Sequence, residues 1–240
     1  MRLQVRGAGD RPPDTDPRVL LVEDEAHTAD VVGRRLRREG FRVQVTGTPG
    51  QAGAWIDELW PDLMVLDAWP APNECKILLQ RLRSWSQLPV IMISPLRDSA
   101  ERIWGLALGA DDFMGGPLDA DELALRIRSL LRRAGWSATH GREVVAAGPL
   151  VLDDQMRRVR VRGAWVTLTA VEFALLAFLA RSPHHAFRRE ELLEQVWGYT
   201  VGDGSTVTVH VRRLREKIEV DPAHPMLITT VWGVGYCFKP

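Results

Sequence analysis

The 240-residue sequence predicts two domains of different class, a doubly wound parallel α/β sheet followed by an α+β winged-helix domain. Two observations support this prediction. From Arg18 to Arg133, short apolar runs alternate with amphipathic helical patterns, which is typical of a parallel sheet covered by helices. After Gly148 the pattern changes to short alternating strands, three helical segments and a terminal hairpin.

Each strand of the first domain is predicted from an apolar run. Continuous apolar stretches such as LMVL and VIMI favour strands that are buried on both faces, as in parallel sheets. Amphipathic patterns between the runs predict five helices. We place this domain at 18–134, a linker at 135–147 and a disordered, Pro- and Asp-rich extension at 1–17. The five runs are RVLLV (18–22), FRVQV (41–45), DLMVLD (62–67), PVIMIS (89–94) and DDFM (111–114).

The second domain, at 148–240, begins with strand patterns. LVLDD and RRVRVRGAWVTL alternate like antiparallel strands, with a turn at Gly163. LTAVEFALLAFLARSP predicts a helix that starts with a capping box, because Thr169 and Glu172 have the required spacing. FRREELLEQVWG and STVTVHVRRLREKIEV predict two further helices, and MLITTVWGVGYCFKP predicts a β-hairpin.

The composition alone names no partner, because 31 basic residues balance 31 acidic ones. Cys75 and Cys237 do not have metal-ligand spacing and cannot form a framework of several disulfides. No run approaches the roughly 18 apolar residues of a membrane span. We therefore expect a cytoplasmic protein.

Acidic residues follow two strands that should be neighbours in the sheet. Asp67 ends the third predicted strand, and Glu23 and Asp24 follow the first. Ligands bind such sheets beyond the carboxyl ends of the strands, so these carboxylates should converge there. Mg²⁺ is the cation that such oxygen ligands suit, and a carboxylate beside it can accept a phosphoryl group. Ser94, at the end of the fourth strand, offers a hydroxyl nearby.

The motifs LLVEDE, PDLMVLD, PVIMIS and GLALGADDF resemble the receiver domain of two-component response regulators, which has a flavodoxin-like fold. The second half, with REELLEQVWG and TVTVHVRRLREKIE, is similar to the winged-helix output domain of OmpR/PhoB-type regulators. The resemblance implies that Asp67 is the phosphoacceptor and that Glu23, Asp24 and Asp67 bind Mg²⁺. It implies that Ser94 and Phe113 are the switch residues.

The receiver departs from this family pattern around Asp67. Gly116 stands where the family has a lysine that pairs with the phosphoryl group, and Cys75 stands where a glycine is usual. Trp69 places a large ring two residues after the acceptor. Two interpretations remain open: a conventional regulator phosphorylated by a histidine kinase, or a phosphorylation-independent one set by dimerisation or a small-molecule ligand. We favour the second interpretation.

An enzyme hypothesis, a phosphohydrolase with Asp67 as nucleophile, is disfavoured because such enzymes commonly need an acid where Trp69 stands. The resemblance instead implies a homodimer. The charges that match the family's dimer face are those of Arg102, Asp112, Glu122 and Arg126.

The third helical segment of the output domain predicts a DNA-recognition helix for double-stranded promoter DNA. Its core face should contain Val207, Val211, Leu214 and Ile218, with arginines on the face away from the core. On the wing, Trp232 stands where the family often has a minor-groove arginine, so we expect weaker wing contacts. The loop at 197–204 matches the loop that in this family contacts RNA polymerase or a neighbouring subunit. The predicted DNA-binding residues are Thr208, Val209, Arg212, Arg213, Arg215 and Trp232.

Overall fold

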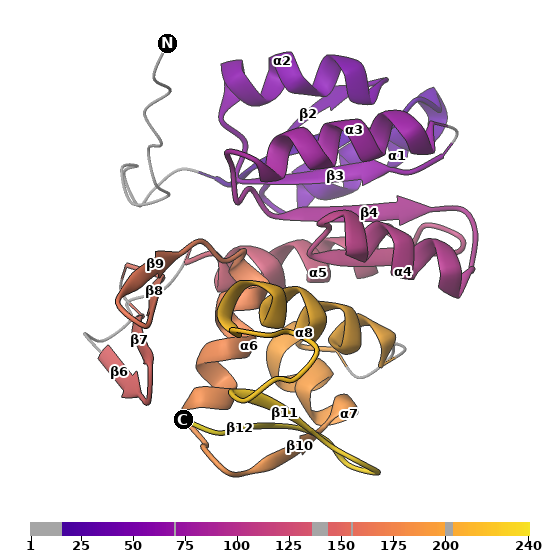
Figure 1. Cartoon of the computed structure of the whole chain (residues 1–240). Helices are drawn as coiled ribbons and strands as arrows, with labels where there is room; N and C mark the ends of the chain where they lie inside the picture. Colours follow the sequence, from indigo (N-terminus) through magenta and orange to yellow (C-terminus); the bar gives the residue numbers. More distant parts are fainter. Residues whose placement is uncertain (1–15, 70, 136–143, 155, 200–203) are drawn as a thin grey trace. The chain divides into compact units, whose positions relative to one another are not determined.

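The computed structural model describes residues 16–69, 71–135, 144–154, 156–199 and 204–240 (Figure 1). The chain divides into two compact units, Met1–Trp136 and Ser137–Pro240, and each is described by itself. Among the described residues, no helix is both long enough and apolar enough to cross a membrane.

The first unit contains a five-stranded parallel sheet in the order β2-β1-β3-β4-β5. This order confirms the predicted doubly wound sheet and places β1 directly beside β3. The three central strands are almost wholly buried, as their continuous apolar sequences require. The strands are β1 (Arg18–Val22), β2 (Arg42–Thr46), β3 (Leu63–Asp67), β4 (Val90–Ser94) and β5 (Asp112–Gly115).

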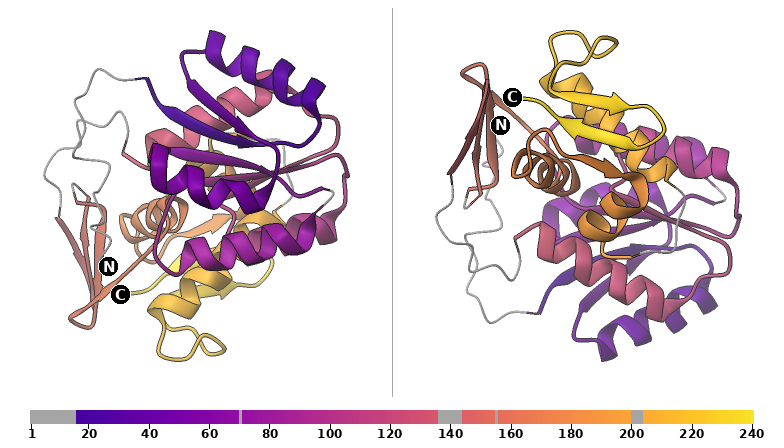
Figure 2. Two further views of the ribbon diagram at one scale, coloured as in Figure 1. Left: turned by 90° about the horizontal axis from the view of Figure 1, so that it is seen from above. Right: turned by 90° about the horizontal axis from the view of Figure 1, so that it is seen from below.

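Helices cover both faces of this sheet, as Figure 2 shows. On one face α1 packs against α5, and on the other α3 contacts both α2 and α4. Four of the helices begin at a side-chain cap, with Glu25, Thr48, Asp98 or Asp119 accepting backbone N–H groups of the first turn. The helices are α1 (Ala26–Arg38), α2 (Pro49–Leu59), α3 (Pro72–Arg83), α4 (Ser99–Leu108) and α5 (Ala120–Arg133).

The second unit begins with an antiparallel four-stranded sheet in the order β6-β7-β8-β9. Its first strand, β6 (Val144–Ala147), corrects the last four residues of the predicted linker at 135–147, because these four pair with β7, and residues 136–143 lie outside the described part of the chain. The sequence did not reveal this strand, since VVAA is short and its burial depends on its partner. The other strands are β7 (Leu150–Asp153), β8 (Arg158–Val161) and β9 (Ala164–Val166).

The three predicted helices and the predicted terminal hairpin complete this unit, but a third strand joins the hairpin. Phe187 and Arg188, predicted as the start of the second helix, lie in this strand because they pair with β12, and the helix begins at Arg189. The helices are α6 (Ala170–Ala180), α7 (Arg189–Leu192), which continues as a π-helical turn (Leu193–Trp197), and α8 (Ser205–Ile218). The sheet has the order β10-β12-β11, with β10 (Ala186–Arg188), β11 (Ile228–Val231) and β12 (Gly235–Phe238). The last two strands form the wing hairpin, drawn in yellow in Figures 1 and 2.

Candidate functional site: an acidic receiver pocket and a basic helix face

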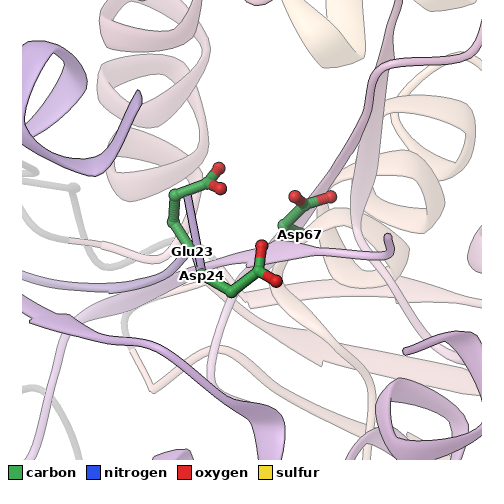
Figure 3. Close-up of side chains that lie close together, drawn as sticks. All are labelled: Glu23, Asp24 and Asp67. Carbon is green, nitrogen blue, oxygen red and sulfur yellow. The ribbon is translucent and has the colours of Figure 1, made fainter. Parts of the chain in front are cut away.

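Three carboxylates meet at the carboxyl edge of the receiver sheet. Asp67 is the last residue of β3, and Glu23 and Asp24 directly follow β1, which pairs with β3. One carboxylate oxygen from each residue lies within 4.8 Å of the other two. Figure 3 shows the three side chains gathered beyond the strand ends. The structure therefore brings together the acidic residues that strand order predicted.

Burial and mutual repulsion oppose ionisation in this cluster. Burial, together with the carboxylates of Glu23, Asp24 and Glu101, raises the pKa of Asp67 to about 7, although the Trp69 N–H donates to Asp67 Oδ1 at 3.0 Å. Burial is also the main cause that raises the pKa of Glu23. A divalent cation would remove this repulsion, and hard carboxylate oxygens are what Mg²⁺ prefers. The residues therefore fit a Mg²⁺ ion.

A fourth carboxylate, Glu101, was missed by the sequence analysis. Ser94 ends β4 as predicted, and its Oγ donates a hydrogen bond of 2.7 Å to Glu101 Oε2 in the first turn of α4. The Leu96 N–H donates back to the same Oγ at 3.1 Å. The Ser94 hydroxyl, which is predicted to respond to a phosphoryl group, thus donates its hydrogen bond to Glu101. The carboxylate of Glu101 would repel a phosphoryl group on Asp67.

Gly116 adopts a backbone conformation that other residues resist. Its φ is +96°, and its N–H donates to the carbonyls of Ser94 and Leu96 at 3.0 Å each. A Cβ at this position would lie 2.8 Å from Arg97 Cγ and would also meet the Nε of that side chain. A lysine here would therefore have to displace Arg97 and strain the backbone.

In the loop after β3, Cys75 is buried against the backbone of Asp67, whereas Trp69 is exposed to solvent. Cys75 is fully buried, and its Sγ donates to the Asp67 carbonyl at 3.2 Å. Burial raises the pKa of its thiol to about 12, so it is a poor nucleophile. Trp69 is 53% exposed, close to Asp67 in sequence but outside the core.

The predicted dimer-face charges lie on α4, β5 and α5, and Arg126 pairs with two of the others within the chain. Arg126 Nη1 is 2.8 Å from Asp112 Oδ2, and its Nη2 is 2.6 Å from Glu122 Oε1. Arg102 is half-buried on α4. Phe113, which the resemblance predicts as the switch aromatic, is buried in β5. A symmetric dimer would have to share or exchange these pairs.

On α8 the solvent-exposed stripe follows the spacing i, i+4, i+8. It contains Thr208, Arg212 and Glu216, with Val209 half-buried at its margin. Arg212 is the most available cation, since its side chain is 82% exposed and pairs only at the surface with Glu216, 3.1 Å away. The predicted core residues Val207, Val211, Leu214 and Ile218 are all buried.

Arg213 does not face away from the core as predicted. Its side chain is 11% exposed, and its Nη2 lies 3.0 Å from Oε1 of the buried Glu172 on α6. Lys217 Nζ binds the other oxygen of Glu172 at 2.6 Å. Burial acts to raise the pKa of Glu172, but the two cations overcome it and hold that pKa below its usual value. Glu172 also completes the predicted capping box with Thr169.

Arg215 connects α8 to the wing. Its Nε donates to the Ile228 carbonyl at 2.8 Å and its Nη2 to Thr230 Oγ1 at 3.0 Å, both on β11. Tyr236 on β12 adds a hydrogen bond of 3.3 Å to Thr208 Oγ1. The helix and the hairpin are therefore held as one element.

Comparisons with known proteins agree with both halves of this architecture. A family model described as "Response regulator receiver domain" matches residues 19–128, and one described as "Transcriptional regulatory protein, C terminal" matches residues 163–238. The "Sensory transduction protein RegX3" of Mycolicibacterium smegmatis is 40% identical over 221 residues, covering 91% of this chain and 97% of that protein. The chain belongs to the OmpR/PhoB family of response regulators.

Two further relatives support this OmpR/PhoB assignment. The "DNA-binding response regulator MtrA" of the same organism is 39% identical over 225 residues, covering 93% of this chain and 97% of that protein. The solved structure of a RitR mutant superposes with a TM-score of 0.68 at 26% identity, covering 93% of this chain and 99% of that one. The chain is thus an OmpR/PhoB-type DNA-binding response regulator.

Proposed function

We propose that this response regulator controls transcription from promoter DNA in the cytoplasm without phosphorylation of Asp67. The observation that carries the proposal is the state of the two groups that should respond to a phosphoryl group. Position 116 is a glycine covered by Arg97, and the Ser94 hydroxyl is bonded to Glu101. An aspartyl phosphate would lack its lysine and would face an additional negative charge.

Glu23, Asp24 and Asp67 are the residues that would hold Mg²⁺. When bound, the ion supplies positive charge to phosphate oxygens at the carboxylate it contacts. The chain's own residues confine the carboxylate of Asp67, through the Trp69 N–H and the buried strand β3. We propose that the metal here relieves carboxylate repulsion and supports the fold, rather than serving enzymatic turnover as in a phosphohydrolase.

For the output domain we propose that α8 enters a major groove. On α8 the residues assigned to DNA are Thr208, Val209 and Arg212, which lie on or beside the exposed stripe. On the wing, Trp232 is assigned to DNA as well. Arg213 and Arg215 are assigned to positioning the helix and the wing, because Glu172 and β11 engage their guanidinium groups. One recognition helix per half-site would suit a homodimer on tandem sites.

Three partners complete the proposal. Dimerisation through α4, β5 and α5 would produce the state that binds DNA. Alternatively, a small-molecule ligand bound to the receiver would produce this state. RNA polymerase would contact the loop at 197–204, of which residues 200–203 lie outside the described part of the chain.

The decisive experiment combines intact-mass measurement with DNA binding. Purified protein is incubated with acetyl phosphate and Mg²⁺ beside an Asp67→Ala control, and DNA affinity is measured before and after. We expect equal DNA affinity for both proteins, with or without the treatment. A phosphoryl adduct on the wild type that raises its DNA affinity would establish the conventional interpretation, in which a histidine kinase phosphorylates Asp67.

A further inference from the structure

The tip of the wing hairpin presents an isolated tryptophan to solvent. Trp232 is 90% exposed, and Val234 beside it is 38% exposed. The segment from Ile228 to Phe238 contains no charged residue. Almost none of its surface is covered by the described residues of its own unit, so the ring is available to a partner, and the surrounding structure decides which partner it can meet.

The turn that carries Trp232 is sharply defined. The Val234 N–H donates to the Val231 carbonyl at 3.0 Å, and Gly233 has a φ of +76°, which favours glycine. Gly235 is also required, because a Cβ there would collide with the Phe187 carbonyl of β10. The backbone therefore fixes the tip, and the ring projects from a rigid support.

Hydrogen bonds from α8 fix the position of the wing hairpin that carries Trp232. Arg215 of α8 binds two groups on β11, and Tyr236 of β12 binds Thr208 on the exposed stripe of the same helix. A DNA duplex that meets Thr208 and Arg212 therefore lies against the same assembly that holds the wing. This continuity with the DNA-binding face selects DNA as the partner of the ring.

We infer that Trp232 is an apolar wedge that enters the minor groove next to the half-site and unstacks a base step. Apolar side chains used in this way kink the duplex, and base–aromatic contacts do not release counterions. The wing would therefore add affinity that is insensitive to salt, in place of the weaker wing contacts expected from the sequence, whereas a wing arginine would add a salt-dependent contact. Flexible pyrimidine–purine steps such as TA would be preferred at the wedge, instead of a stiff, narrow A-tract.

This inference rests on DNA binding by the output domain but not on the state of Asp67. The test uses the full chain and a duplex selected by the wild-type protein from a randomised library. Affinity is measured by anisotropy at several salt concentrations, and bending by energy transfer between dyes at the duplex ends. The variants are Trp232→Ala, Trp232→Arg and the matched control Trp165→Ala, which removes a ring that is 62% exposed on β9.

We expect Trp232→Ala to lose about ten- to a hundredfold in affinity, with an unchanged salt slope and a reduced bend. Trp232→Arg should steepen the salt slope by about one phosphate contact. Trp165→Ala should match the wild type.

Wild-type affinity and bend in Trp232→Ala would overturn the inference. A loss of affinity with the DNA bend intact would also overturn it, because the ring would then contact the DNA backbone instead of unstacking bases. A loss confined to cooperative binding of two copies would overturn it too, because the ring would then contact the second copy of the protein. Failure of the wild type to select any duplex would instead refute DNA binding itself.

Discussion

Removing the charge of Asp67 should stabilise the metal-free protein at alkaline pH. In the wild type the Trp69 N–H donates to Asp67 Oδ1 at 3.0 Å. The substitution Asp67→Asn keeps an oxygen for this hydrogen bond and removes the titrating carboxyl group. Burial and the neighbouring carboxylates raise the pKa of Asp67 from its ordinary 3.8 to about 7. Between these two values the folded protein keeps a proton that the unfolded chain has lost.

The sign follows from proton binding. Because the native state binds more protons in this window, the free energy of unfolding falls as pH rises through it. Each pKa unit is worth about 1.4 kcal/mol, which gives an upper limit of ~4 kcal/mol. Asp67 is only partly buried, so solvent screening reduces the expected effect to about 2 kcal/mol.

Urea unfolding of the full chain at pH 4.5 and pH 8, in the presence of a chelator, measures this effect on the receiver transition. The stability difference between Asp67→Asn and the wild type should grow by about 2 kcal/mol between the two pH values. Mg²⁺ should stabilise the wild type and not the variant. Asp57→Asn, at an exposed position on α2, is the control. A difference that is the same at both pH values would refute the reasoning.

Three further predictions concern other charges and one glycine. Glu172→Gln should lower the stability of the output unit by about 3 kcal/mol, because Arg213 and Lys217 lose their buried partner. The unfolding transition of the output unit measures this loss, and wild-type stability of the variant at neutral pH would contradict it. Gly116→Lys should not restore a phosphoryl adduct and should destabilise by about 1–2 kcal/mol, since φ is +96° and Arg97 is in the way; an adduct seen by intact mass would show that the lost lysine is the only defect. Arg212→Ala should lower the salt slope of DNA binding by about one, whereas Arg158→Ala, exposed on β8, should not change it.

The acidic pocket could be predicted from sequence because strand ends define it. In a doubly wound sheet the carboxyl ends of neighbouring parallel strands share one edge, so Asp67, Glu23 and Ser94 are placed by the strand pattern alone. Glu101 could not be placed in this way. It lies on a helix, and whether it reaches Ser94 depends on how α4 packs against the sheet.

The error at Arg213 has a similar cause. The spacing of Val207, Val211 and Leu214 defines one apolar face of α8 correctly. By helical periodicity alone, Arg213 falls on the side of the helix away from that face. However, α8 packs on two neighbours, so Thr206 and His210 are buried as well and the covered arc is wider than one face. The charge of Glu172 sits within that arc. Periodicity identifies the core face of a helix but not the number of its neighbours.

The two sites differ in how their charges are neutralised, and this supports a structural role for the metal. In the output unit the buried Glu172 has its cations in the chain, so its pKa is lowered. In the receiver the groups that act electrostatically on Asp67 are carboxylates, so its pKa is raised. The receiver pocket therefore destabilises the fold until a cation arrives from solution. If the metal only relieves this repulsion, Asp67→Asn protein should bind DNA as the wild type does in Mg²⁺. If the metal instead prepares Asp67 for phosphorylation, the same protein should lose its response to acetyl phosphate.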